Sequence, residues 1–182
     1  MARDGIDDHE TDADQILATY GRRAESVDPR RYSISRPGNA LAMAQRERIL
    51  REALARRGVE ALDGLDILEV GCGTGNELSR LVAAGAEPRR LSGIDLREGA
   101  IGEARRGVPE AHLVVGDASR LPYPDGSFDL VYPATALSSM PSRSMRVQVA
   151  AEMRRVVRPG GLIVSDFAWN PSHRLAIIDV PG

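Results

Sequence analysis

Short apolar runs and amphipathic stretches alternate along the chain from residue 67 onward. Five runs have the length and the apolar character of buried strands: 67–70, 91–94, 112–115, 128–132 and 162–167. Helical patterns separate them, over 76–84, 98–106 and 142–157. Strands that alternate with helices pair in parallel through right-handed crossovers. The pattern predicts an α/β fold with a doubly wound, mostly parallel sheet and helices on both faces.

The chain before residue 67 follows a different pattern. Residues 1–14 hold six acids, one arginine and few apolar side chains, so we expect a disordered tail. Residues 15–58 predict two helices, one over 15–25 and one over 40–57 that stops at Gly58. Two breaks with proline, Asp28-Pro29 and Pro37-Gly38, separate them. With residues 59–182 as the α/β core, we expect a single domain.

Composition and charge exclude several classes of protein. A net charge of −2 argues against a general nucleic-acid binder. Cys72 is the only cysteine, so no internal disulfide forms, and a reducing cytoplasm fits. No apolar run approaches the roughly 18 residues of a membrane span, and the acidic N-terminus is unlike a signal peptide. We therefore expect a cytoplasmic protein that binds no membrane.

The segment Ile67–Gly75, with the sequence ILEVGCGTG, is the first candidate site. A buried strand runs into a turn of three glycines, Gly71, Gly73 and Gly75, and then into a helix. Glycines let a ligand approach the backbone, and the first turn of the helix presents free N–H groups. This arrangement predicts a nucleotide site.

Acidic residues follow the next two strands. Asp95 can accept hydrogen bonds from both hydroxyls of a ribose, although Asp is also a favoured helix N-cap. Asp117 can accept from an adenine amino group, with the N–H of Ala118 donating to a ring nitrogen, or it can serve only as a turn residue. Leu96 and Leu121 would supply apolar walls for the base.

The spacing of the glycines separates two kinds of nucleotide. A dinucleotide fingerprint, G-x-G-x-x-G, counted from Gly71 requires a third glycine at position 76. Asn76 stands there, and the glycine is at position 75. A nicotinamide-dependent oxidoreductase is therefore disfavoured.

Four segments taken together resemble the Rossmann-like S-adenosylmethionine-dependent methyltransferases, in that family's order and spacing over about residues 60–168. The segments are LEVGCGTG (68–75), GIDL (93–96), GDASRLPYPDGSFDLVY (116–132) and EMRRVVRPGGLIVSDF (152–167). The last two look like the branch that methylates quinones, lipids and natural products. The resemblance implies an enzyme with S-adenosylmethionine as cofactor, S-adenosylhomocysteine as product and a small-molecule methyl acceptor.

The resemblance also implies roles for particular residues. Glu69, Gly71 and Gly73 would position the methionine part, Asp95 the ribose, and Asp117 with Ala118 the adenine. The family pattern adds four residues to this cofactor-binding set: Cys72, Asn76, Leu96 and Pro133. Residues 15–58 would form an N-terminal helical lid, in which Tyr32 closes over the cofactor. Either Arg22 or Arg23 would meet the cofactor's carboxylate, or both lie on a solvated surface helix.

The chemistry of methyl transfer needs few catalytic groups. A methyl carbon on a sulfonium is already electrophilic, so the protein mainly holds the acceptor in line and excludes water. In the family that the chain resembles, acceptor contacts commonly lie at and after the end of the fourth strand, which implies Tyr132, Thr135 and Ser138 here. We assign no catalytic base and no metal site, and we expect Cys72 to be a packing residue rather than a nucleophile. The Asn/Asp-Pro-Pro-Tyr signature of amino-methylating nucleic-acid enzymes is missing, since Tyr132-Pro133-Ala134-Thr135 stands in its place.

The C-terminal part departs from the family pattern. The family's sheet ends in an antiparallel hairpin beside strand 5, and the few residues after Phe167 allow one short strand, so the hairpin is missing or reduced. Strand 5 would then present an unpaired edge that favours a homodimer. A shortened chain, or a tail that pairs within the monomer, are the alternatives. We also keep a second function, a non-catalytic relative that binds the cofactor and serves as a partner subunit.

Overall fold

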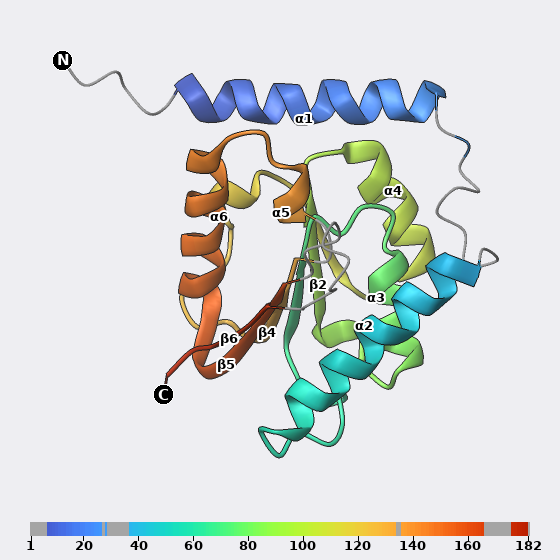
Figure 1. Cartoon of the computed structure of the whole chain (residues 1–182), viewed down its shortest axis with the longest axis vertical. Coiled ribbons are helices and arrows are strands. Elements are labelled where there is room, and N and C mark those ends of the chain that lie inside the picture. The colour runs from blue at the N-terminus through green and yellow to red at the C-terminus, as the bar shows by residue number, and fades with distance from the viewer. Residues whose placement is uncertain (1–6, 27, 29–36, 134–135, 166–175, 182) are drawn as a thin grey trace.

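The computed structural model describes residues 7–26, 28, 37–133, 136–165 and 176–181. Its sheet has six strands in the order β3-β2-β1-β4-β5-β6 (Figure 1). The strands are β1 (Ile67–Val70), β2 (Leu91–Asp95), β3 (His112–Val115), β4 (Phe128–Tyr132), β5 (Val157–Ser165) and β6 (Ala176–Asp179). The first five pair in parallel and β6 is antiparallel to β5. The predicted doubly wound α/β fold is confirmed.

The helices cover both faces of this sheet. They are α1 (Asp7–Ser26), α2 (Pro37–Ala55), α3 (Asn76–Ala83), α4 (Glu98–Gly107), α5 (Ala136–Ser139) and α6 (Arg143–Val156). One apolar cluster joins α2, α3 and α4 to one face, with Ile67 and Leu130 at its centre. A second joins α6 to the other face, around Leu68 and Val131. Because neighbouring strand residues point to opposite faces, β1, β2, β4 and β5 each supply both clusters, as expected of a parallel sheet buried on two sides.

The strand order places the topological switch point of the sheet next to β1. The chain runs from β1 outward to β2 and β3, and then crosses back to β4 on the other side of β1. At such a switch point the loops after neighbouring strands diverge, and ligands bind at the carboxyl ends of the strands. The glycine turn therefore stands at the position where this fold binds nucleotides.

Helix α1 lies across the carboxyl ends of the strands, above α4 and α5 (Figure 1). It begins at Asp7, within the acidic segment 1–14 that the sequence predicted as disordered. The Asp12 side chain is only 5% exposed, and the Ser142 hydroxyl at the start of α6 donates a hydrogen bond to it. This tertiary contact, which sequence composition does not show, gives a buried acid a partner. Ile16 packs on the second cluster.

Strand β5 corrects two expectations. The segment Arg158–Gly161 was predicted only to end the preceding helix, but it belongs to the strand. The pairing of β4 with β5 is irregular at this end of the strand, since its register shifts between Phe128 and Leu130. Gly160 has φ +82°, its N–H donates to Val180 O at 2.9 Å, and Val180 N donates to Gly161 O at 3.2 Å. The prediction that strand 5 has an unpaired edge is wrong, because β6 pairs with it from Leu162 to Ser165 within the same chain.

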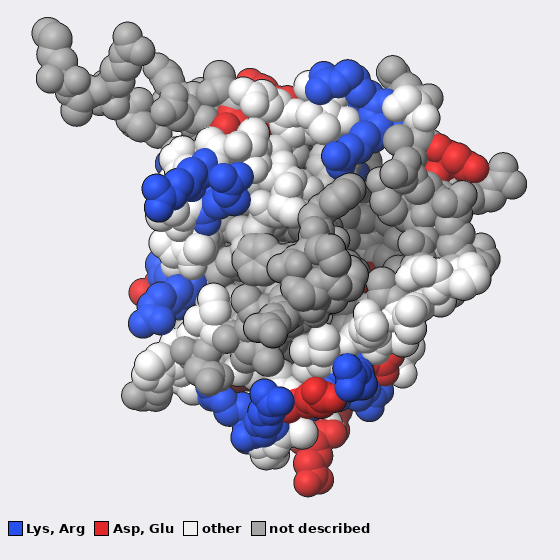
Figure 2. All heavy atoms as spheres, in the orientation of Figure 1, with Lys and Arg blue, Asp and Glu red and all other residues white. Residues whose placement is uncertain are grey.

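Within the described residues, no helix is long and apolar enough to cross a membrane. Figure 2 shows the face that carries α2, α6 and β6. Basic and acidic side chains are scattered around its rim, and no continuous basic surface crosses the described part of this face.

Candidate functional site

The glycine turn that follows β1 is hydrogen-bonded to the backbone of β2. Gly71, Gly73 and Gly75 have φ values of +72°, +54° and +80°, which residues other than glycine rarely adopt. The N–H groups of Gly71 and Cys72 both donate to Ile94 O, at 2.8 and 3.0 Å. The turn is therefore shaped by its glycines and fixed to the neighbouring strand.

Asp95, the last residue of β2, reaches into this turn. Its carboxylate is 9% exposed, and Oδ2 accepts a hydrogen bond from Gly73 N at 2.9 Å. Oδ1 accepts from Arg97 N at 2.9 Å. Arg97, not Asp95, is the N-cap residue of α4, so the interpretation of Asp95 as a helix cap is wrong. The structure brings the turn and the acid together as the sequence predicted.

Arg97 is a member of the site that sequence reasoning missed. Its Nε and Nη2 donate to Asp95 Oδ1 and Oδ2, at 3.0 and 3.3 Å. Its guanidinium carbon lies 4.2 Å from the centre of the Tyr20 ring on α1, and the Tyr20 hydroxyl is 3.1 Å from Ser139 Oγ. The sequence offered one indication of this contact: Arg97 stands only two residues after Asp95, close enough for its side chain to reach the carboxylate.

The loop after β3 carries the candidate adenine contacts. Asp117 Oδ1 accepts from Ser119 N at 2.8 Å and caps the short 3-10 helix η3 (Ala118–Arg120). Asp117 is thus confirmed as a turn residue, and Oδ1 is the oxygen that serves this role. Ala118 is half-buried on the second cluster, and Leu121 is 4% exposed.

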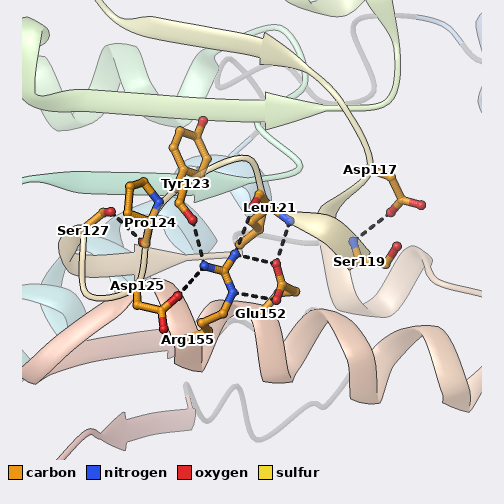
Figure 3. A network of polar contacts seen from close by, with 9 residues as sticks. All are labelled: Asp117, Ser119, Leu121, Tyr123, Pro124, Asp125, Ser127, Glu152 and Arg155. Atoms are coloured by element: carbon orange, nitrogen blue, oxygen red, sulfur yellow. Dashed lines mark hydrogen bonds and ion pairs between the residues drawn. The ribbon is translucent and has the colours of Figure 1, made fainter.

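A fork of hydrogen bonds from α6 fixes this loop (Figure 3). Arg155 Nε and Nη2 donate to Glu152 Oε1 and Oε2, at 2.8 and 2.7 Å, and Glu152 Oε2 accepts from Leu121 N at 2.8 Å. The same guanidinium donates to Leu121 O, Tyr123 O and Asp125 Oδ1. The hydrogen bonds from Arg155 lower the pKa of Glu152, so the pair stays charged at neutral pH.

Glu69 and Tyr132 lie side by side on one face of the sheet. They are register partners on β1 and β4, and their side chains are 2% and 3% exposed. Ile67 and Leu130, two residues earlier on each strand, belong to the cluster under α2, α3 and α4. Both side chains therefore lie on that face, just below the glycine turn.

The other predicted cofactor residues lie around the turn. Asn76 is the exposed first residue of α3, Leu96 is half-buried after β2, and Pro133 is buried after β4. The Cys72 thiol is buried, and burial together with the charges of Glu69 and Asp95 raises its pKa far above the ordinary value. The interpretation of Cys72 as a packing residue fits this environment.

The predicted lid contacts are only partly within the described residues. Tyr32 and Thr135 lie outside them. Arg22 Nη2 donates to Thr19 Oγ1 at 3.2 Å, and the Arg23 guanidinium lies 5.3 Å from the Tyr20 ring centre. The aromatic residue that the described chain brings over the site is Tyr20.

A separate cavity of about 330 Å³ lies between α2 and α3. Its floor is apolar and includes Leu50, Leu54 and Leu81, and charged side chains of both helices line it. None of its described lining residues is Asp95, Asp117 or a glycine of the turn. The cavity therefore contains none of these cofactor candidates, although Tyr132 at the end of β4 also lines it. No group of three or more His, Cys, Asp or Glu side chains in the described chain is placed to hold a metal ion.

Comparison with known proteins gives a consistent result. A sequence model described as a methyltransferase domain matches residues 67–161. A demethylmenaquinone methyltransferase from Beutenbergia cavernae is 34% identical over 150 residues, which is 80% of this chain and 58% of that protein. One from Parafrankia sp. is 33% identical over 195 residues, 94% of this chain and 70% of that protein. The chain thus spans only part of the length of these relatives.

Solved structures share the fold. An S-adenosylmethionine-dependent methyltransferase from Methanosarcina mazei is 29% identical, with a TM-score of 0.53 over 58% of this chain and 54% of that chain. The N-methyltransferase NodS from Bradyrhizobium japonicum, in complex with S-adenosyl-L-homocysteine, is 22% identical, with a TM-score of 0.64 over 82% of this chain and 71% of that chain.

Proposed function

The chain belongs to the Rossmann-like S-adenosylmethionine-dependent methyltransferases, and on that premise we propose that it transfers a methyl group from S-adenosylmethionine to a small-molecule acceptor. The observation that carries the proposal is the hydrogen bond from Gly73 N to Asp95 Oδ2, 2.9 Å long, at the carboxyl ends of β1 and β2. It joins a backbone turn that a ligand can approach to the acid that suits a ribose diol.

The residues of the turn and of the next two strand tips fit this cofactor. Asp95 would bind the ribose hydroxyls, and Asp117 with the N–H of Ala118 would bind the adenine. Glu69, Gly71 and Gly73 would position the methionine part. Cys72, Asn76, Leu96 and Pro133 complete the proposed set around them. Asp117 Oδ2, which makes no hydrogen bond within the described part of the chain, and the half-buried Leu96 support a base lying between the two loops.

The bound cofactor supplies an electrophilic methyl group, so the chain contributes position and shielding. Tyr20 and the rest of α1 lie over the strand ends and would keep water from the reacting atoms, and this position supports a lid role for α1. Tyr132 and Ser138 are the described residues proposed to face the acceptor. The names of the two demethylmenaquinone methyltransferases support an acceptor that is a small organic molecule.

Titration calorimetry tests the cofactor assignment directly. We expect S-adenosylhomocysteine to bind and NAD to give no heat. Binding of NAD alone would contradict the proposal. Transfer of labelled methyl from S-adenosylmethionine to a small molecule in a cell extract then supports the enzyme, whereas binding without transfer supports the partner-subunit alternative.

Self-association is a separate proposal that now rests on β6. This strand, not β5, is the last strand of the sheet, and Ile178 on it is 48% exposed. An edge strand with exposed apolar side chains favours pairing with a second copy. Light scattering at micromolar concentration tests this: a dimer supports the proposal, and a monomer contradicts it.

A further inference from the structure

The Asp95 carboxylate is already fully used by this chain. Oδ1 accepts from Arg97 N and Nε, at 2.9 and 3.0 Å, and Oδ2 accepts from Gly73 N and Arg97 Nη2, at 2.9 and 3.3 Å. Each carboxylate oxygen has about two acceptor positions. A ribose that approaches Asp95 therefore meets acceptors that are occupied, and the Arg97 side chain holds two of them.

The Arg97 side chain is held in this place from its other side as well. Its guanidinium lies over the Tyr20 ring at 4.2 Å, a cation–π contact between α1 and the site. A β-carbon at Gly73 would lie 3.3 Å from Nη2, so the guanidinium rests against the glycine turn itself. Asp95, Tyr20 and the turn thus surround one cationic group at the position proposed for the ribose.

We propose that Arg97 sets the cofactor affinity by competing with the ribose for Asp95. The inference rests on the proposed cofactor site. The backbone donors Gly73 N and Arg97 N can keep their bonds to Asp95 when the side chain leaves. The two ribose hydroxyls then take the positions that Nε and Nη2 vacate. A charged donor is a stronger partner for a carboxylate than a hydroxyl, so its removal favours the ligand.

Arg97→Ser is the test variant. Position 97 is the N-cap of α4, its φ and ψ are −92° and 108°, and it makes no side-chain cap. Serine is favoured at an N-cap, so the helix is expected to fold unchanged. By calorimetry we expect S-adenosylhomocysteine to bind about 2- to 5-fold more tightly than to the parent protein, which corresponds to the upper part of the range for a partly exposed ion pair. Arg106→Ser, an exposed arginine on the same helix, is the matched control and should leave the affinity unchanged.

A double-mutant cycle ties the effect to Asp95. In an Asp95→Ala background, Arg97→Ser should give no gain, because the contested carboxylate is gone. Tyr20→Leu removes the ring that holds the guanidinium and should tighten binding in the same direction, by a smaller factor. Equal or weaker binding by Arg97→Ser, with binding by the parent intact, overturns the inference. If neither protein binds S-adenosylhomocysteine, the proposed cofactor site itself is wrong, and the inference falls with it.

Discussion

Gly75 and Ala104 are in close contact where α4 packs against the glycine turn. A β-carbon at position 75 would lie 3.0 Å from Ala104 Cβ and 3.1 Å from its Cα. Gly75 also has φ +80°. The third glycine of the turn is therefore required by packing as well as by backbone conformation, and its neighbour is a helix rather than a ligand.

Gly75→Ala should destabilise the protein by about 2–4 kcal/mol, because strain at positive φ adds to a clash with a helix that cannot easily shift. Urea unfolding followed by circular dichroism measures this change. Gly58→Ala is the matched control, since Gly58 has φ +70° and nothing within 4 Å of the added carbon. Equal losses in the two variants would show that only the backbone conformation matters.

Asp95→Ala should weaken binding of S-adenosylhomocysteine by about 1.5–3 kcal/mol, as expected when hydrogen bonds to a charged acceptor are lost. The variant also removes the acceptor of Gly73 N, so the turn loses a bond even without ligand. Calorimetry measures the affinity, and Asp63→Ala, an exposed acid before β1, is the control. Unchanged affinity in Asp95→Ala would contradict the ribose assignment.

Arg155→Ala should destabilise the chain by about 1–3 kcal/mol, because a single guanidinium joins α6 to three residues of the loop 121–125. Cofactor binding should weaken as well, since Leu121 begins that loop and Ala118 lies in the short 3-10 helix directly before it. Arg155→Lys keeps the charge but not the fork and should recover only part of the loss. Arg154→Ala, the exposed neighbour, serves as the control in both unfolding and calorimetry. A loss of the same size there would contradict the role of the fork.

Glu152 should make stability depend on pH on the acid side. Hydrogen bonds from Arg155 lower its folded pKa below the ordinary value of 4.5. Its contribution is therefore fully present above pH 4.5 and is lost as the pH falls through the lowered folded value. Comparison of parent and Glu152→Gln by urea unfolding between pH 7 and pH 3 should show a difference that is constant near neutrality and shrinks in acid. A difference that grows in acid would mean that folding raises the pKa of Glu152 instead of lowering it.

The Cys72 thiol should resist alkylation in the folded protein. Burial, helped by the charges of Glu69 and Asp95, raises its pKa, and the side chain is 4% exposed. Iodoacetamide at pH 8 should react at least about 100-fold more slowly with the native protein than with protein unfolded in urea, because reaction requires local opening. Rapid native modification would place the thiol in solvent.

Part of the fold and of the site follows from local pattern. The predicted bounds of β1, β3 and β4 agree with the structure, because short apolar runs between Gly, Asp and Pro residues leave few ways to place a buried strand. The family motifs also located the glycine turn, Asp95 and the loop after β3. The spacing of these motifs follows from the lengths of a turn, a crossover helix and a strand, and neighbouring residues determine each of these lengths.

Long-range pairing decided the rest. Near the start of α1, the Asp12 carboxylate accepts a hydrogen bond from the Ser142 hydroxyl, and the contact of Tyr20 with Ser139 joins residues 119 positions apart. The extension of β5 and its pairing with β6 depend on backbone bonds between Gly160, Gly161 and Val180. Sequence alone determined which residues can form a nucleotide site. Only the tertiary structure placed the Tyr20 ring of α1 against the Arg97 guanidinium beside Asp95, because a contact between distant elements depends on where the chain returns and not on local periodicity.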